Sequence, residues 1–128
     1  MKILVGYKET SIGRELLDLA IHRVKAHSGE IHVVTSLFGD EGTELISEAE
    51  KNLDYAHTYL EEKGVKNQIH LLIRGRNIGE DLVDFAQEND VDEIVIAVKS
   101  RSRVGKLLFS PTAQYVILKS PCPVTSVK

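Results

Sequence analysis

Short apolar runs alternate along the chain with longer stretches in which apolar residues recur every three or four positions. The short runs are rich in Ile, Leu and Val, which is typical of buried strands, and the longer stretches have the period of amphipathic helices. Five strands are predicted, at Lys2–Tyr7, Glu30–Phe38, Asn67–Ile73, Glu93–Val98 and Val124–Val127. Four helices are predicted between them, from Thr10 or Ser11 to Ser28, from Thr43 to Gly64, from Asn77 to Asn89 and from Ser110 to about Lys119.

Strands that alternate regularly with helices predict a parallel sheet whose two faces are both covered. In such a sheet a ligand crevice is expected at the carboxyl ends of the strands, where the winding reverses. The last strand is short and follows Pro121 and Pro123, so it is predicted to lie at a sheet edge. An uncovered edge can pair with a second copy, so a homodimer is predicted through Val124, Thr125, Ser126 and Val127.

The stretch Glu93–Thr112 combines a strand, a cationic loop and a helix start. The loop over Lys99–Lys106 contains no acid and four bases, Lys99, Arg101, Arg103 and Lys106. Ser110 is a favoured N-cap, and Pro111 is tolerated at the first helical position. Positive charge beside a helix N-terminus favours an anion. The sequence therefore predicts either an anion site or a solvated connection whose bases only keep the protein soluble.

Composition limits the classes of function. The 128 residues are 42% hydrophobic and 27% charged with a net charge of −3, which predicts one domain over 1–128 with a buried core. This charge argues against non-specific nucleic-acid binding. No apolar run approaches the length of a membrane span and no signal peptide is recognised, so neither a membrane partner nor export is expected. The lone Cys122 fits a reducing cytoplasm.

Other constellations predict no chemistry. The five histidines are interpreted as non-metal residues, with His32 and His70 on different strands and His57 on a helix. Cys122, between two prolines, is interpreted as packing rather than as a nucleophile. Glu41, Glu44 and Glu48 are interpreted as a solvated helix face, and Asn77 with Glu80 as a capping box. Tyr115 and Leu118, if they face outward on the last helix, are assigned to dimer packing rather than to ligand contact.

Several stretches together carry a family resemblance. They are the opening ILVGY with the later ELLDLAI, Arg74-Gly75 after the third strand, DEIVIA, and VGKLLFSPTAQYVILKSPCPV near the end. With them the chain resembles a single-domain universal stress protein over its whole length. The resemblance implies a three-layer α/β/α fold of the adenine-nucleotide α-hydrolase-like, Rossmann-like type. Its open parallel five-stranded sheet would have the strand order 3-2-1-4-5, and its fifth strands would form the dimer.

Many members of that family bind ATP through a G-x2-G-x9-G-[S/T] pattern after the fourth strand and an Asp after the first. This chain departs from both. Ala97, Ser100 and Ser110 stand at the three glycines and Pro111 at the [S/T] position, while Lys8 replaces the Asp. Lys has hydrogen-bond donors only, so it cannot replace the carboxylate as an acceptor. The resemblance therefore allows ATP or another adenine nucleotide, but the residues do not favour it.

The predicted function is a binding and regulatory module that acts as a homodimer, with a nucleotide or other anion site between strands one and four. A phosphate or a short phosphorylated metabolite is one expected ligand. Two alternatives stay open: weak ATP hydrolysis or self-phosphorylation at Ser100, Ser102 or Ser110, and a dimerising interaction protein whose crevice is empty. No catalytic residue is assigned. The candidate binding residues are Lys8, Val34, Ala97, Ser100, Arg101, Ser102, Arg103, Gly105, Lys106, Ser110, Pro111 and Thr112.

Overall fold

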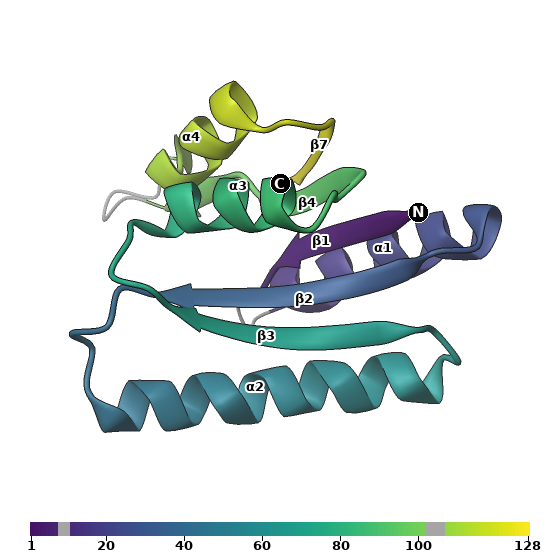
Figure 1. Cartoon of the computed structure of the whole chain (residues 1–128), viewed down its shortest axis with the longest axis horizontal. Coiled ribbons are helices and arrows are strands. Elements are labelled where there is room, and N and C mark those ends of the chain that lie inside the picture. Colours follow the sequence, from purple (N-terminus) through teal and green to yellow (C-terminus); the bar gives the residue numbers. More distant parts are fainter. Residues whose placement is uncertain (8–10, 102–106) are drawn as a thin grey trace.

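A computed structural model describes residues 1–7, 11–101 and 107–128 of the chain. A parallel sheet lies between two layers of helices (Figure 1). The helices are α1 (Ser11–His27), α2 (Thr43–Glu62), α3 (Ile78–Glu88) and α4 (Pro111–Lys119). The strands are β1 (Lys2–Gly6), β2 (Glu30–Leu37), β3 (Asn67–Ile73), β4 (Glu93–Ala97), β5 (Lys99–Arg101), β6 (Leu107–Phe109) and β7 (Val124–Val127).

The main sheet has the order β3-β2-β1-β4-β7, and all of its neighbouring strands pair in parallel. This confirms the predicted order 3-2-1-4-5, in which β7 is the fifth strand of the sheet. The longest pairing joins β2 to β3, in a register that runs from Ile31↔Asn67 to Leu37↔Ile73. The two edges of the sheet are β3 and β7, so the last strand lies at an edge as predicted.

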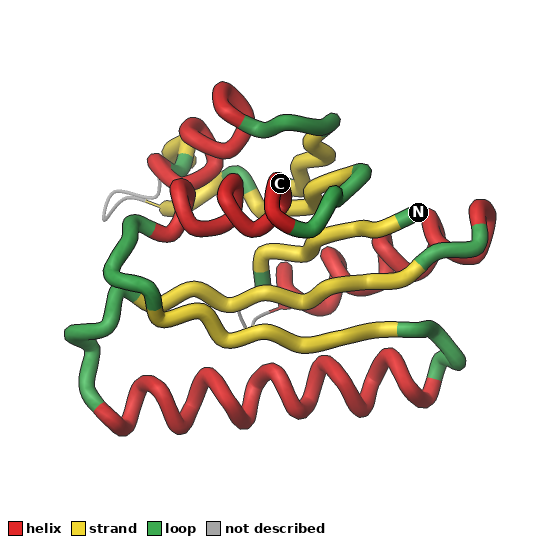
Figure 2. Tube along the Cα trace, viewed as in Figure 1, coloured by secondary structure: helices red, strands yellow, loops and turns green. Residues whose placement is uncertain are grey.

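A second, antiparallel pair of strands was not predicted. β5 and β6 pair as a ribbon of their own, with Lys99 opposite Phe109 and Arg101 opposite Leu107. The segment interpreted as a loop over Lys99–Lys106 therefore begins as a strand. A two-stranded ribbon that stands outside the main sheet needs no alternation of apolar and polar residues, so the pattern gave no sign of it. Figure 2 shows the ribbon next to the start of α4.

Side chains alternate between two cores, one on each face of the sheet. Along β1, Ile3 and Val5 pack with α1 and α2, whereas Leu4 packs with α3 and α4. All three are completely buried, and burying one such side chain stabilises the fold by about 1.5–3 kcal/mol. The strands therefore read as continuous apolar runs because both of their faces are covered.

Three predicted strand ends were one residue too long. Tyr7, Phe38 and Val98 each follow a strand rather than belong to it. Tyr7 and Val98 still donate backbone N–H groups to Val34 and Val127, and their apolar side chains continue the sequence pattern, so the pattern could not show where each strand ends. Within the described residues, the helices are too short or too polar to cross a membrane.

Candidate groove between the starts of α3 and α4

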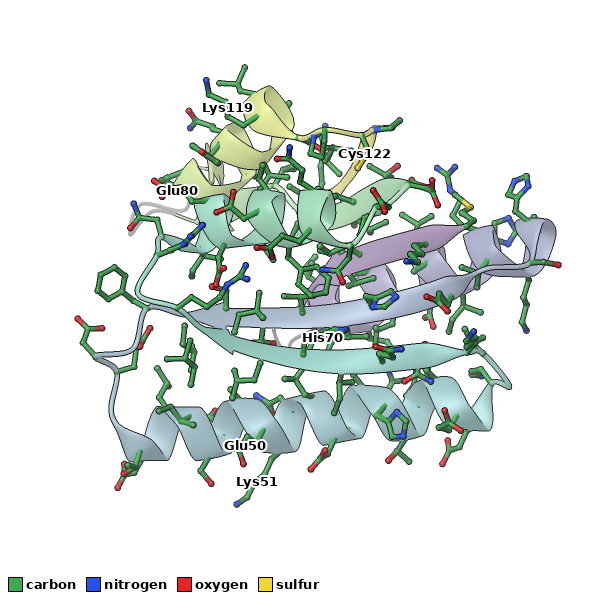
Figure 3. All side chains as sticks on the ribbon, in the orientation of Figure 1. Glu50, Lys51, His70, Glu80, Lys119 and Cys122 are labelled. Carbon is green, nitrogen blue, oxygen red and sulfur yellow. The ribbon has the colours of Figure 1, made fainter. Side chains whose placement is uncertain are left out.

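An open groove of about 620 Å³ lies at the carboxyl end of β2, beside the first turns of α3 and α4. Three segments line it: the turn after β2, the turn that leads into α3, and the start of α4. The lining residues are Phe38, Asp40, Glu41, Arg76, Asn77, Ile78, Gly79, Glu80, Pro111, Thr112 and Tyr115. Figure 3 shows Glu80 on α3 at the end that lies beside α4. A groove at this end of a parallel sheet is where ligands bind in folds of this class.

The two helices approach closely because Gly79 has no side chain. A Cβ built on Gly79 would lie 3.1 Å from the Cβ of Tyr115. Real Cβ contacts are seldom this short, so a larger residue would force α4 away from α3. The Tyr115 ring packs over Gly79 and remains 36% exposed at the groove.

A buried ion pair fixes the start of α3 against the sheet. Asp81 is fully buried and accepts hydrogen bonds from the Arg74 Nε at 2.5 Å and from the Ser36 hydroxyl at 2.8 Å. Arg74 also donates to Glu88 at 2.9 Å, and this bond, together with Asp81, raises the pKa of the Arg74 guanidinium. Since Ser36 lies on β2 and Arg74 follows β3, the network joins α3 to β2 and to the turn after β3.

The turn after β2 is closed by its own carboxylate. Glu41 accepts hydrogen bonds from the backbone N–H groups of Gly39 and Phe38, both at 2.7 Å. These hydrogen bonds hold the pKa of the Glu41 carboxyl below its ordinary value, and the bond from Gly39 has the largest effect. The interpretation of Glu41 as part of a helix face was wrong, because α2 begins only at Thr43. The Glu41 carboxylate reaches back two and three residues to bond the turn locally instead.

The described lining of the groove is more acidic than basic. Asp40, Glu41 and Glu80 bring three carboxylates, and Arg76 brings one guanidinium, which pairs with Asp84 outside the lining. A strongly anionic ligand would therefore need cations from elsewhere.

The residues predicted to bind a ligand lie in several separate parts of the fold. Pro111 and Thr112 line the groove, and the Ser110 hydroxyl caps α4 by accepting the Ala113 N–H at 3.4 Å. The side chain of Val34 is 1% exposed in the core, and its carbonyl accepts the Tyr7 N–H at 2.9 Å. Ala97 packs against the core under α1 and α2. Ser100 and Arg101 lie in β5, and the remaining candidates lie outside the described residues: Lys8, Ser102, Arg103, Gly105 and Lys106.

Several lining residues were missed or assigned another role. Phe38 and Asp40 gave no signal, because the turn after β2 resembles any polar connection. Tyr115 had been assigned to dimer packing but lies at the groove, whereas Leu118 is 79% exposed. The predicted capping box of Asn77 and Glu80 does not form: the Asn77 side chain makes no cap bond and instead donates to Glu80 at 3.5 Å.

Two other expectations concern histidine and cysteine. His32 and His70, interpreted as separate, are in contact at 3.0 Å, because the register of β2 and β3 brings them onto one face. Among the described residues, no group of three His, Cys, Asp or Glu side chains is arranged to hold a metal ion. Burial raises the pKa of the Cys122 thiol, which reduces its reactive thiolate fraction.

Comparisons with known proteins agree with this architecture. The model of the universal stress protein family matches residues 1–128. A universal stress protein from Mycolicibacterium smegmatis is 28% identical over 126 residues, covering 98% of this chain and 96% of that protein. A structure of the universal stress protein from Archaeoglobus fulgidus superposes with a TM-score of 0.90 at 34% identity, covering 99% of this chain and 97% of the other. A second structure of the universal stress protein from Archaeoglobus fulgidus, in complex with dAMP, has a TM-score of 0.83 at 31% identity and covers 99% of this chain and 96% of the other. The chain therefore belongs to the universal stress protein family.

Proposed function

We propose that this chain is a binding module that takes an adenine nucleotide, preferably a monophosphate, into the groove between the starts of α3 and α4. The observation that carries the proposal is the groove itself, which opens at the carboxyl end of the sheet and is bordered by two helix N-termini. The Archaeoglobus protein in complex with dAMP, 31% identical to this chain, supports the class of ligand.

Aromatic residues favour a ligand with a base over a bare phosphate. Phe38 is 47% exposed although it is a large apolar residue, and Tyr115, which also lines the groove, is 36% exposed. Exposed aromatic rings in a groove are suited to stacking on a nucleobase, which contributes about 1–3 kcal/mol per base. A phosphate ion alone would leave both rings in water.

The phosphate would meet helix N-termini rather than a glycine-rich loop. The first backbone N–H groups of α3, at Ile78 and Gly79, have no acceptor within the helix, and Thr112 adds a hydroxyl at the start of α4. Pro111 removes one such N–H from α4. With few donors and three carboxylates in the described lining, we expect one phosphate to be accepted more readily than three.

The experiment that tests this proposal is isothermal titration of the purified chain with AMP, ATP and inorganic phosphate. We expect AMP to bind and phosphate alone to bind much more weakly. Phe38→Ala should weaken AMP binding by about tenfold, which corresponds to the loss of one stacking contact. The matched control is Tyr55→Ala, because Tyr55 is an aromatic residue of similar exposure, 42%, on α2 and outside the groove lining.

Two results would contradict the proposal. The first is heat and affinity for AMP that are indistinguishable from those for phosphate, because then the base adds nothing. The second is equal weakening by Phe38→Ala and Tyr55→Ala, because then the ligand is not in the groove.

We also propose that two copies pair through β7. β7 is an edge strand of the main sheet, and Leu118, 79% exposed, and Ile117, 42% exposed, lie on the helix just before it. The carbonyl of Pro123 accepts the N–H of Ile94 on β4 at 3.0 Å, and that of Val127 accepts the N–H of Val98, just after β4, at 3.1 Å. In a parallel pair, alternate residues of a strand make the backbone hydrogen bonds to its neighbour. The N–H of Ser126 therefore points away from β4, towards the outer edge of β7. A strand of a second copy could accept that N–H.

A further inference from the structure

His32 and His70 meet end to end on the face of the sheet that α3 covers. The Nδ1 of His32 lies 3.0 Å from the Nε2 of His70, while the ring centroids are 5.2 Å apart and the rings are inclined by only 15°. The centroid separation exceeds the N···N separation by about two ring radii, so the rings are joined at their edges and do not stack face to face. The lone-pair directions therefore point at each other, which is the geometry of a shared proton rather than of two ligands converging on a metal ion.

A carboxylate orients the far side of the pair. The Nε2 of His32 lies 2.9 Å from Glu30 Oε1, and Lys66 holds the other oxygen of that carboxylate at 3.1 Å. His32 is 5% exposed, and the Phe85 ring of α3 lies 4.7 Å from the His70 ring, measured between centroids. The pair is thus shielded from water on the side of α3 and is linked to Glu30 by a direct hydrogen bond.

The other charged groups on the neighbouring elements have partners elsewhere. On β1, Lys2 stands opposite Glu30 in the register, and its ammonium donates to the Asn89 carbonyl at 3.1 Å. On α3, the acidic side chains pair or bond away from the histidines: Asp81 and Glu88 with Arg74, Asp84 with Arg76, and Glu80 with Asn77. Within the described residues, Glu30 is therefore the charge that acts directly on the pair.

The number of protons on the two rings determines whether the hydrogen bond between them can form. In the neutral pair, the Nε2–H of His32 donates to Glu30 and the Nε2–H of His70 donates to Nδ1 of His32, a tautomer assignment that follows from the partners. One extra proton can sit on Nδ1 of His70, which has no hydrogen-bond partner among the described residues, without breaking either bond. A second must sit on Nδ1 of His32, where two N–H groups would face each other and two cations would adjoin.

We propose that the His32–His70 contact is an acid-sensitive latch, which holds the edge strand β3 against β2 and opens when both imidazoles become protonated. Among the described strands, only β2 pairs with β3 in the main sheet, so β3 is held by a strand on one edge only and loss of this contact weakens that edge. α2 packs on its opposite face, where Ile69 and Leu71 contribute to the core.

The direction of the pH dependence follows from the groups involved. Burial, and then the neighbouring His32, lowers the pKa of His70 below its ordinary value, so folding disfavours the protonated ring. This contribution to stability is present above the unfolded pKa of about 6.5 and is lost as the pH falls below it. His32, followed by Lys66, lowers the pKa of Glu30, and that contribution is also lost in acid, at a lower pH.

The test compares thermal unfolding of the full chain at about pH 7.5 and about pH 5.5, on either side of the ordinary imidazole pKa. His70→Gln keeps an amide donor for His32 but cannot be protonated. The matched control is His57→Gln, which removes a histidine that bonds Asn67, the first residue of β3, at 2.7 Å. We expect the Tm of the wild type and of His57→Gln to fall by at least about 3 °C more than that of His70→Gln.

An equally steep fall for His70→Gln and the wild type would overturn the latch. A second measurement on the wild type applies even if the variant does not fold. In an NMR titration of the ring protons, we expect His70 to titrate below the ordinary imidazole pKa and its protonation to shift the ring signals of His32, which it contacts at 3.0 Å. A His70 ring that titrates at or above the ordinary imidazole pKa of about 6.5, with no change at His32, would overturn the proposal as well.

Discussion

Arg74 and Arg76 stand two positions apart after β3, and each pairs with an aspartate of α3. Their surroundings differ. Asp81, the partner of Arg74, is completely buried, whereas Asp84, the partner of Arg76, has a side chain that is 36% exposed. An exposed ion pair contributes little to the stability of the fold because water screens the two charges. A buried carboxylate that loses its partner leaves an unpaired charge in the protein interior, which is strongly destabilising.

We therefore expect Arg74→Ala to lower the free energy of unfolding by about 3 kcal/mol. Arg76→Ala, the matched control, should lower it by less than about 1 kcal/mol. Denaturant unfolding followed by circular dichroism measures both. Equal effects of the two substitutions would mean that burial of Asp81 does not determine the strength of its pair.

The sequence could not distinguish these two residues. Arg74 and Arg76 have the same side-chain chemistry and lie in the same turn, and Asp81 is buried in the fold, where it also bonds Ser36, 45 positions away. The contact of His32 with His70 could not be predicted for the same reason, because it depends on the register of two strands. Pairings of this kind are set by tertiary structure, which local patterns do not encode.

At the scale of elements, the two helices that border the groove begin in different ways. Ser110 caps α4 with its side chain, which accepts the Ala113 N–H, and Pro111 takes the first helical position. Asn77 precedes α3 but makes no cap bond with its side chain. The start of α3 is held instead by Asp81 and Arg74.

Ser110→Ala should therefore lower the free energy of unfolding by about 1 kcal/mol, the usual cost of losing a side-chain cap. Asn77→Ala should cost less than about half of that, because there is no cap bond to lose. Thermal unfolding of the two variants side by side gives the comparison. A larger effect at Asn77 than at Ser110 would contradict the account of how these helices begin.

The sequence predicted these elements well where a helix or strand packs on the core. All four helices and the five strands of the main sheet lie where the apolar pattern places them, to within a few residues. The ribbon of β5 and β6 was missed because its strands do not belong to the main sheet. The groove was largely missed because its lining comes from turns, where side chains are not constrained by a periodic pattern.

At the scale of the whole molecule, β7 is the last strand of the main sheet, and its outer edge pairs with no other described strand. We expect the chain to be a dimer in sedimentation equilibrium. Ser126→Pro should make it a monomer, because proline removes the outward N–H while the bonds of β7 to β4 come from its neighbours. Ser126→Ala keeps that N–H and should stay a dimer. A monomeric wild type, or a dimeric Ser126→Pro, would exclude pairing through this edge.

The strand order of the sheet follows from the sequence more directly than the ligand that the protein binds. Alternating strands and helices predict a parallel sheet with a ligand crevice at its carboxyl ends, and family membership fixes the order of its strands. The missing glycines at Ala97, Ser100 and Ser110 argued against a nucleotide, but they do not describe the groove that Phe38 and Tyr115 border. A motif reports one way of holding phosphate, whereas the shape of a site depends on segments far apart in the chain.

The measurement that tests the central claim most directly is an NMR titration of the labelled chain with AMP, followed at every backbone amide. Binding in the groove predicts the largest shifts at Phe38, Glu41, Gly79, Glu80 and Thr112. A second hollow, at the opposite end of the strands and lined by Met1, Lys2, Gly29 and Lys66 among others, should show no comparable change. Shifts centred on that second hollow, or none at millimolar AMP, would contradict the proposal that the groove is a nucleotide site.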